Sequence, residues 1–274
     1  MKLAPAAGEA RYHEDVRLIR QTTWTRPQGV VVANPKGGSG KTPTSLLLAG
    51  VLGDIRGGYV AAWEASEAPG TLAARAEGQP TRGLAELLER AERITSAGEL
   101  GGFTAPQTSH ADVVGSAGAR ALLEAADVEA VRAVLDTYYR ITVADTGNNP
   151  QSAVFAQLVR SSDVFVIPTT VHPDAVDGVL ALAAELDRSE HGRRLLTQAV
   201  VVVTHTGAPE PTGVLEELAE QLTGLGVAET VDVPHDPAIA AGGEITLAHL
   251  SEHSRRQWVR VAAAVVTSLQ AANT

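Results

Sequence analysis

Short apolar runs alternate with longer stretches of helical spacing along most of the chain. The apolar runs are rich in Val, Ile and Ala, which is typical of strands buried on both faces of a sheet. They lie at 30–33, 59–64, 112–114, 139–145, 163–168, 198–204 and 230–234. Helical spacing is found at 11–21, 46–52, 83–94, 127–135, 173–186, 211–222 and 251–270. This alternation predicts an α/β protein with a single doubly wound, mostly parallel sheet and helices on both faces.

No linker or change of composition divides the chain after its first strand. We therefore expect a lead-in segment over 1–27, ordered against the sheet edge around Trp24 and Pro27, and one domain over 28–274. The stretch 96–109 is rich in Gly, Thr and Ser and predicts a loop.

Two of the predicted helices carry further detail. Asp127 is expected to be the N-cap residue of the helix that it begins. The helix over 251–270 places Arg256 and Arg260 opposite an apolar face. That face is formed by Trp258, Val261, Ala262, Val265 and Leu269.

The first apolar run leads into a glycine-rich loop, residues 35–42, which we call the phosphate loop. Glycines let the main chain wrap around an anion, and the N-terminus of the following helix adds partial positive charge. Lys41 can reach the β- and γ-phosphates of a nucleotide, and the Thr42 hydroxyl can ligate Mg²⁺. The expected cofactors are ATP and Mg²⁺. The expected contacts from this region are Lys36, Gly37, Gly38, Ser39, Gly40, Lys41, Thr42 and Pro43.

The loop departs from the usual G-x-x-x-x-G-K-[ST] pattern, because Pro35 occupies the position of the first glycine. The alternative interpretation is a glycine-rich turn without a ligand. The order of strand, loop and helix favours the phosphate-binding interpretation.

Two of the predicted strands end in an acidic residue, Glu64 and Asp145. Open α/β sheets place their ligands at the carboxyl ends of the strands. Asp145 beside the phosphate loop can therefore hold Mg²⁺ through a water. The alternatives are a solvated strand-end acid for Glu64 and a helix N-cap or turn residue for Asp145.

Composition limits the possible chemistry. The chain has 274 residues and no cysteine, which excludes disulfides, thiolate metal sites and a cysteine nucleophile. Its net charge of −10 provides no global basic field for nucleic acid, although a local patch remains open. No apolar run reaches the roughly 20 residues that span a bilayer. We expect a cytoplasmic protein without a membrane anchor.

The phosphate loop, with its second lysine at Lys36, resembles the deviant Walker A loop of the ParA/MinD/Soj family of P-loop ATPases. The resemblance implies that Lys36 crosses to the nucleotide of a partner subunit in an ATP-bound homodimer. It places Glu64 and Ser66 at the two positions of a family D-x-D motif, whose second Asp positions the attacking water. Because Ser66 is no carboxylate, and Glu67 is one residue out of register, we expect slow or altered hydrolysis.

The same resemblance suggests contacts elsewhere in the site. The loops after the last two strands would hold the adenine base, through Thr204, His205, Pro234 and Asp236. Pro43 replaces a family Thr or Ser whose hydroxyl touches the α-phosphate. The residues expected to be catalytic are Lys36, Lys41, Glu64 and Asp145, and those expected to hold the metal are Thr42 and Asp145.

The resemblance predicts a partitioning or positioning ATPase, closest to ParA-like proteins, with an activating partner protein. Non-specific DNA contact would use Arg255, Arg256 and Arg260, and association with the nucleoid would follow. The structural alternative for these arginines is the solvated face of a core-packing helix. The functional alternative is a regulatory switch of the same fold that hydrolyses little and acts through a protein partner. A metallocluster-assembly ATPase of this superfamily usually needs cysteines, and the chain has none.

Overall fold

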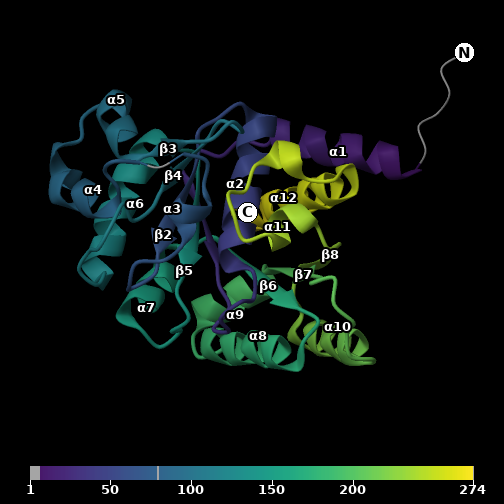
Figure 1. Ribbon diagram of the computed structural model, residues 1–274. Helices are drawn as coiled ribbons and strands as arrows, with labels where there is room; N and C mark the ends of the chain where they lie inside the picture. The colour runs from purple at the N-terminus through teal and green to yellow at the C-terminus, as the bar shows by residue number, and fades with distance from the viewer. Residues whose placement is uncertain (1–6, 79, 274) are drawn as a thin grey trace, which may run out of the picture.

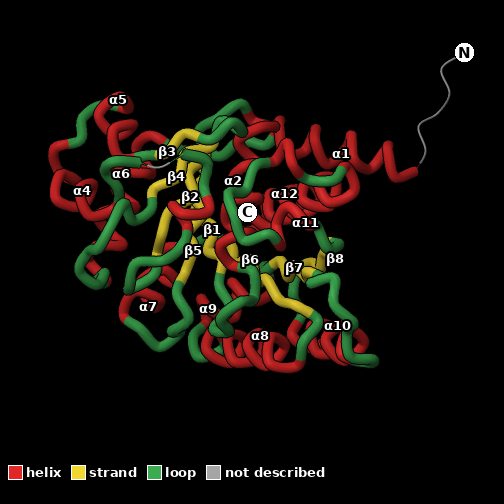
Figure 2. The backbone as a smooth tube through the Cα atoms, viewed as in Figure 1, coloured by secondary structure: helices red, strands yellow, loops and turns green. Residues whose placement is uncertain are grey.

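An eight-stranded sheet forms the centre of the molecule, and helices cover both of its faces (Figures 1 and 2). The computed structural model of the chain describes residues 7–78 and 80–273. The strands are β1 Gln28–Val32, β2 Val60–Ala65, β3 Ala105–Pro106, β4 Ala111–Val114, β5 Ile141–Thr146, β6 Val164–Thr170, β7 Val200–Thr204 and β8 Glu229–Val233. Their order is β3-β4-β2-β5-β1-β6-β7-β8, and only the pair β3 and β4 is antiparallel among them. The predicted doubly wound, mostly parallel sheet is confirmed.

Strand β1 lies inside the sheet, between β5 and β6, and all five of its residues are buried. Val32 pairs with Asp145 on one side and with Val166 on the other. Glu64 of β2 pairs with the same Asp145. The carboxyl ends of β1, β2 and β5 therefore lie side by side, which brings together three chain segments that the sequence separates widely.

The helices form two layers. On one face α2 Lys41–Arg56 and α12 Glu252–Ala272 pack against the sheet, and α1 Ala7–Gln21 packs on both of these helices (Figure 1). The opposite face is covered by α4 Leu84–Arg90, α6 Ala125–Tyr138, α7 Ala153–Ser161, α8 Pro173–Leu186, α9 Glu190–Thr197 and α10 Val214–Leu225. Three short helices, α3 Leu72–Arg75, α5 Ala97–Leu100 and α11 Pro237–Ala240, lie in the connections.

The C-terminal helix buries the face that its spacing predicts. The five apolar residues expected there are each at most 1% exposed. Helix α1 of the lead-in segment packs on α2 and α12, and its Arg11 lies 3.8 Å from Glu229 of the edge strand β8. Ile19 of α1 is fully buried in the same core cluster as α2 and α12. This helix therefore extends the helical layer and shares its core.

Several local predictions are corrected by the structure. The stretch 96–109 is not one loop, since it contains α5, a 3₁₀ turn at Gly101–Phe103 and strand β3. The N-cap residue of α6 is Glu124, and Asp127 stands at the third helical position. Its carboxylate accepts a 2.8 Å hydrogen bond from the Glu124 main-chain N–H, as in a capping box. Helices α7 and α9 were not predicted from the spacing.

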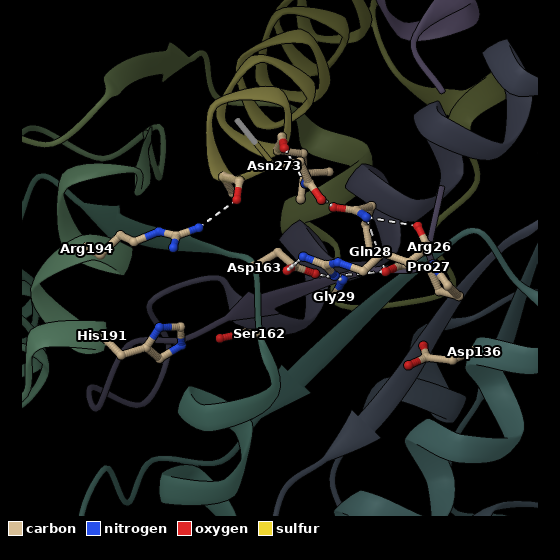
Figure 3. Close-up of polar contacts among 12 residues, drawn as sticks. Arg26, Pro27, Gln28, Gly29, Asp136, Ser162, Asp163, His191, Arg194 and Asn273 are labelled. Atoms are coloured by element: carbon tan, nitrogen blue, oxygen red, sulfur yellow. Dashed lines mark hydrogen bonds and ion pairs between the residues drawn. The ribbon is translucent and has the colours of Figure 1, made fainter. Parts of the chain in front are cut away.

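A polar network closes the amino end of β1 (Figure 3). The Asp163 carboxylate accepts hydrogen bonds from the Gly29 main-chain N–H at 2.7 Å and from the Arg26 guanidinium at 2.6 Å. Asn273, just after α12, donates to Gln28 Oε1 at 2.7 Å. These contacts fix the start of β1 against β6 and the end of α12. At the opposite end of β1, where the phosphate loop begins, the register is set by pairing with β5 and β6.

Candidate functional site

The phosphate loop joins the end of β1 to the start of α2. Gly38 has φ 78° and Gly40 has φ 89°, both in the left-handed region that favours glycine. Gly40 is also the N-cap residue of α2, which is 16 residues long. The N-terminus of this helix therefore adds unpaired N–H groups and partial positive charge to the loop.

Lys41 stands at the first position of α2, and its side chain returns toward the loop. Its Nζ donates hydrogen bonds to the Lys36 carbonyl at 3.0 Å and to Asn148 Oδ1 at 2.6 Å. Burial lowers the pKa of Lys41 to about 8, and the charge of Asp145 offsets part of that shift. Both hydrogen-bond acceptors are neutral, so the ammonium group suits an additional anionic partner such as a phosphate.

Thr42 and Asp145 meet beside this lysine. The Thr42 hydroxyl donates to Asp145 Oδ2 at 2.7 Å, and the Ser45 hydroxyl donates to Oδ1 at 3.1 Å. Burial raises the pKa of Asp145 to about 6, against the opposing effects of Thr42, Ser45 and Lys41. Hydroxyl and carboxylate oxygens are ligands that Mg²⁺ prefers, so these residues fit the predicted metal. The N-cap or turn alternative for Asp145 is wrong, because the carboxylate bonds to side chains of α2.

Lys36 is held on the opposite side of the loop. Its Nζ lies 2.7 Å from Asp174 Oδ2 near the start of α8, and both side chains are largely exposed. Its main-chain N–H donates to Asn34 Oδ1 at 2.9 Å. A Cβ atom at Gly178 would stand 2.4 Å from the same Asn34 oxygen, so helix α8 approaches the loop closely. The two loop lysines therefore have separate partners.

Glu64 is buried at the end of β2 and is only 1% exposed. Its Oε1 accepts hydrogen bonds from Arg120 at 2.9 Å and from Ser116 at 2.5 Å. The solvated-acid alternative is therefore wrong. The catalytic role expected of Glu64 stays a prediction, although this oxygen already has two donors.

Arg120 was not singled out in the sequence, because an arginine in a loop carries no local signal. Its guanidinium bonds to Glu64 and donates to the main-chain carbonyls of Ser66, Glu67 and Ala68 at 2.8, 2.7 and 3.1 Å. The Ser66 hydroxyl donates to the Ala68 carbonyl at 2.7 Å. Arg120 thus fixes the segment that follows β2.

A pocket of about 860 Å³ lies over these elements. It is lined by the phosphate loop, by the segment after β2 and by the turn after β5. Lys41, Thr42 and Asp145 all face it, as do Glu67 and Asn148. The structure therefore brings together the lysine, hydroxyl and carboxylate that the sequence proposed for phosphate and metal.

A second pocket of about 360 Å³ lies on the other side of the phosphate loop and shares Gly38, Gly40 and Pro43 with the first. Its lining includes the four residues expected around the base: Thr204, His205, Pro234 and Asp236. The Asp236 carboxylate accepts hydrogen bonds from the main-chain N–H groups of Ala238 and Ser251 at 3.0 and 2.9 Å. It therefore supports the wall of the pocket. Thr44 and Trp258 also line it and were not expected.

His205 forms one edge of the second pocket. Its two ring nitrogens lie 2.7 Å from Glu210 and 2.5 Å from Asp232. Burial lowers the pKa of His205, but the hydrogen bonds and charges of Asp232 and Glu210 together outweigh it, so the net shift is upward. A protonated ring that donates to both acids best satisfies this arrangement.

The three arginines proposed for DNA each have an acidic partner. Arg255 lies 3.1 Å from Asp54, and Arg256 lies 2.7 Å from Glu252. Arg260 pairs with Asp15 at 3.1 Å and also with Glu229. These pairs reduce the local positive charge, and the DNA contact stays a prediction.

No cluster of three or more His, Cys, Asp or Glu side chains could by itself hold a metal ion in the described part of the chain. Within 7–78 and 80–273, none of the helices has the length and apolar character needed to cross a membrane.

Solved structures with this architecture decide the fold. A ParA family ATPase from Chlorobium tepidum superposes with a TM-score of 0.65 over 91% of this chain and 98% of that one, at 16% identity. The chain has the ParA/MinD fold. MinD of Pyrococcus horikoshii complexed with Mg-ADP shares this ParA/MinD fold, with a TM-score of 0.62 over 86% of this chain and 94% of that one, at 13% identity.

The chain also has a sequence similarity to a secretion-associated protein. The chain is 27% identical over 249 residues to the ESX-1 secretion-associated protein EspI of Mycobacterium tuberculosis. The match covers 86% of this chain but 36% of EspI, so the chain spans about a third of the length of the curated relative that it matches. No protein-family model matches the chain.

Proposed function

We propose that this chain binds ATP with Mg²⁺, dimerises in the ATP-bound state and hydrolyses ATP slowly. The observation that carries the proposal is the placement of Lys41 beside the Thr42–Asp145 pair in one pocket over the phosphate loop. The Mg-ADP bound to the MinD relative supports the same choice of ligand.

Each residue of the site has a defined task in this proposal. The main chain at Gly38 and Gly40 and the start of α2 receive the phosphates. Lys41 supplies a point charge that Asn148 keeps in place. Thr42 and Asp145 would hold Mg²⁺, which neutralises phosphate charge when bound. Lys36 would leave Asp174 and reach the nucleotide of a second subunit.

The base would occupy the second pocket. Thr204 and Pro234 provide its walls, and Asp236 holds the wall in shape through its two main-chain hydrogen bonds. The two pockets share the phosphate loop, so a single nucleotide can place its phosphates in one and its base in the other.

The process served by this ATPase has two candidates. Structures of the same fold include a putative plasmid partition protein of Borrelia burgdorferi and the septum site-determining protein MinD of Pyrococcus horikoshii. Their names favour movement of DNA or positioning of another cargo, with an activating partner protein. The match to EspI favours a nucleotide-dependent switch that acts on a protein partner in a secretion-associated setting. The acidic partners of Arg255, Arg256 and Arg260 favour the second candidate, because they leave little free positive charge for DNA.

A binding experiment tests the nucleotide proposal. Calorimetry with ATP and Mg²⁺ should show binding by the wild-type chain and a loss of at least about 100-fold in affinity for Lys41→Ala, since a charge-assisted contact to phosphate is removed. Arg93→Ala removes an exposed cation in the turn after α4 and is the matched control. Unchanged ATP affinity in Lys41→Ala would exclude the phosphate-loop assignment. ATP hydrolysis measured with and without duplex DNA separates the two candidate processes.

A further inference from the structure

The side chain of Glu67 lies in the pocket over the phosphate loop, although sequence register suggested that it would point elsewhere. A Cβ atom built on Gly147 would stand 2.8 Å from Oε2 of Glu67. The carboxylate therefore lies against the turn that follows Asp145. Its other oxygen, Oε1, is buried and has no hydrogen-bond partner among the described residues.

The main chain of Glu67 is held firmly in this position. Its carbonyl accepts hydrogen bonds from the Arg120 guanidinium at 2.7 Å and from the Leu123 main-chain N–H at 2.9 Å. Arg120 also holds the carbonyls on either side, at Ser66 and Ala68. The Arg120 side chain is only 2% exposed, so this clamp is part of the interior. Glu67 is thus carried on a fixed segment.

The other acidic and hydroxyl groups near this turn either have partners or lie outside the pocket. Glu64 Oε1 accepts hydrogen bonds from Arg120 and Ser116, and the Ser66 hydroxyl donates to the Ala68 carbonyl. Glu64 Oε2 is also buried without a partner among the described residues, but Glu64 is not among the residues that line the pocket. Asp145 accepts from Thr42 and Ser45. Glu67 combines an unpartnered carboxylate oxygen with a place in the pocket lining, beside Asn148, the partner of Lys41.

We infer that Glu67 is the catalytic residue that orients the attacking water in this pocket, with Arg120 as the positioning residue that fixes it. The inference rests on the proposed ATPase function. A carboxylate that lines the pocket beside Lys41 and Thr42 can accept a hydrogen bond from a water held next to a bound phosphate. Gly147 allows the close approach, because any larger residue would place an atom against the carboxylate.

The chemical step balances with the groups present. The water oxygen bonds to the γ-phosphorus while the bond from that phosphorus to the β–γ bridging oxygen breaks. That oxygen and its electron pair leave with ADP. The water proton passes to the Glu67 carboxylate and then to the released phosphate, which returns Glu67 to its ionised form.

The test compares Glu67→Gln with wild type and with Glu89→Gln, a matched change at an exposed acid of α4. Three quantities are measured: affinity for ATP with Mg²⁺, affinity for ADP with aluminium fluoride, and single-turnover hydrolysis. The complex of ADP with aluminium fluoride mimics the transferring phosphoryl group and its attacking water. Glu67→Gln should keep ATP affinity within about threefold of wild type, bind ADP with aluminium fluoride at least about tenfold more weakly, and hydrolyse ATP about 100-fold or more slowly.

The outcomes are distinguishable. Wild-type values for all three quantities in Glu67→Gln would overturn the inference, and so would an equal loss of affinity for ATP and for ADP with aluminium fluoride, because that loss would show a general structural role. A wild-type chain that binds ATP without hydrolysing it would also overturn it. Failure of the proposed function itself appears earlier, as the absence of ATP binding by the wild-type chain.

Discussion

Lys36 Nζ lies 2.7 Å from the Asp174 carboxylate, across the gap between the phosphate loop and α8. Exposed ion pairs of this kind are weak because water and salt screen them, so a bound triphosphate can compete for the lysine. In the proposed dimer, Lys36 would exchange Asp174 for the phosphates of the partner subunit. Asp174 would then act as a weak restraint on the nucleotide-free form.

Lys36→Ala should abolish dimerisation driven by a non-hydrolysable ATP analogue, since the charge that crosses the interface is gone. Asp174→Asn should strengthen it, by up to about fivefold in the association constant, because the competing partner is neutral. Light scattering with the analogue and with ADP measures both effects. Equal dimer populations for wild type and Lys36→Ala with the analogue, or for analogue and ADP, would remove Lys36 from the mechanism.

Because the pKa of Asp145 is raised, we expect metal binding to depend on pH. Its pKa is raised to about 6, and a ligand carboxylate must be ionised, so Mg²⁺ affinity should fall about tenfold per pH unit below that value. The folded form holds this proton more tightly than the unfolded form, whose pKa is near 3.8. The Asp145 carboxyl group therefore stabilises the nucleotide-free protein most below about pH 4. This contribution is lost as the pH rises to about 6.

Mg²⁺ titrations monitored by nucleotide fluorescence, between pH 5 and 8, check the first effect, and thermal unfolding checks the second. Asp145→Asn carries no titrating carboxylate and is the comparison for both. A Mg²⁺ affinity of the wild-type chain that stays constant from pH 5 to 8 would count against Asp145 as a metal ligand.

The buried pair of Arg120 and Glu64 predicts a large change in stability. Arg120→Met leaves the Glu64 carboxylate buried without its countercharge, and the free energy of unfolding should fall by about 3–5 kcal/mol. Urea unfolding of the single variant and of Arg120→Met/Glu64→Leu measures the effect. The double variant should recover part of the loss, since no charge is left unpaired. A single variant within about 1 kcal/mol of wild type would contradict this account.

The DNA proposal makes a prediction about salt. If the α12 arginines contact phosphates, Arg256→Ala/Arg260→Ala should weaken binding equally on all sequences and flatten the slope of log affinity against log salt by about 2. Arg188→Ala, an exposed arginine just after α8 that pairs with Glu185, is the control. An unchanged slope in the double variant means that these arginines serve only their pairs with Glu252, Asp15 and Glu229.

The parts of the site that could be predicted are those encoded by contiguous residues. The strand, the glycines and the helix that form the phosphate loop lie within about a dozen consecutive positions. Their order alone therefore predicts that Lys41 and Thr42 stand at the start of the helix, as they do in the structure. Asp145 was expected because it ends a strand, and parallel strands end at one edge of the sheet. The fold could be predicted because the alternation of strands and helices is also visible in contiguous residues.

The remaining contacts join distant segments and leave no local pattern. Arg120 is 56 positions from Glu64, and Asp174 is 138 positions from Lys36. Glu67 could not be placed from register, because the segment after β2 is no longer extended and follows the Arg120 clamp instead of strand alternation. The N-cap position of α6 was predicted at Asp127 instead of Glu124, because Asp is preferred over Glu at N-cap positions.

The central position of β1 also bears on how the chain acquires its structure during synthesis. The strand that carries the phosphate loop bonds to β5 and β6, both more than a hundred residues further along. At ribosomal speeds of about 5–20 residues per second, those partners emerge on the order of ten seconds after β1. Until then β1, which leads into the phosphate loop, has neither of its neighbouring strands. Nascent chains halted before β5 should therefore depend on chaperones and be open to proteases, and ATP would have nothing to bind until the middle of the sheet has closed.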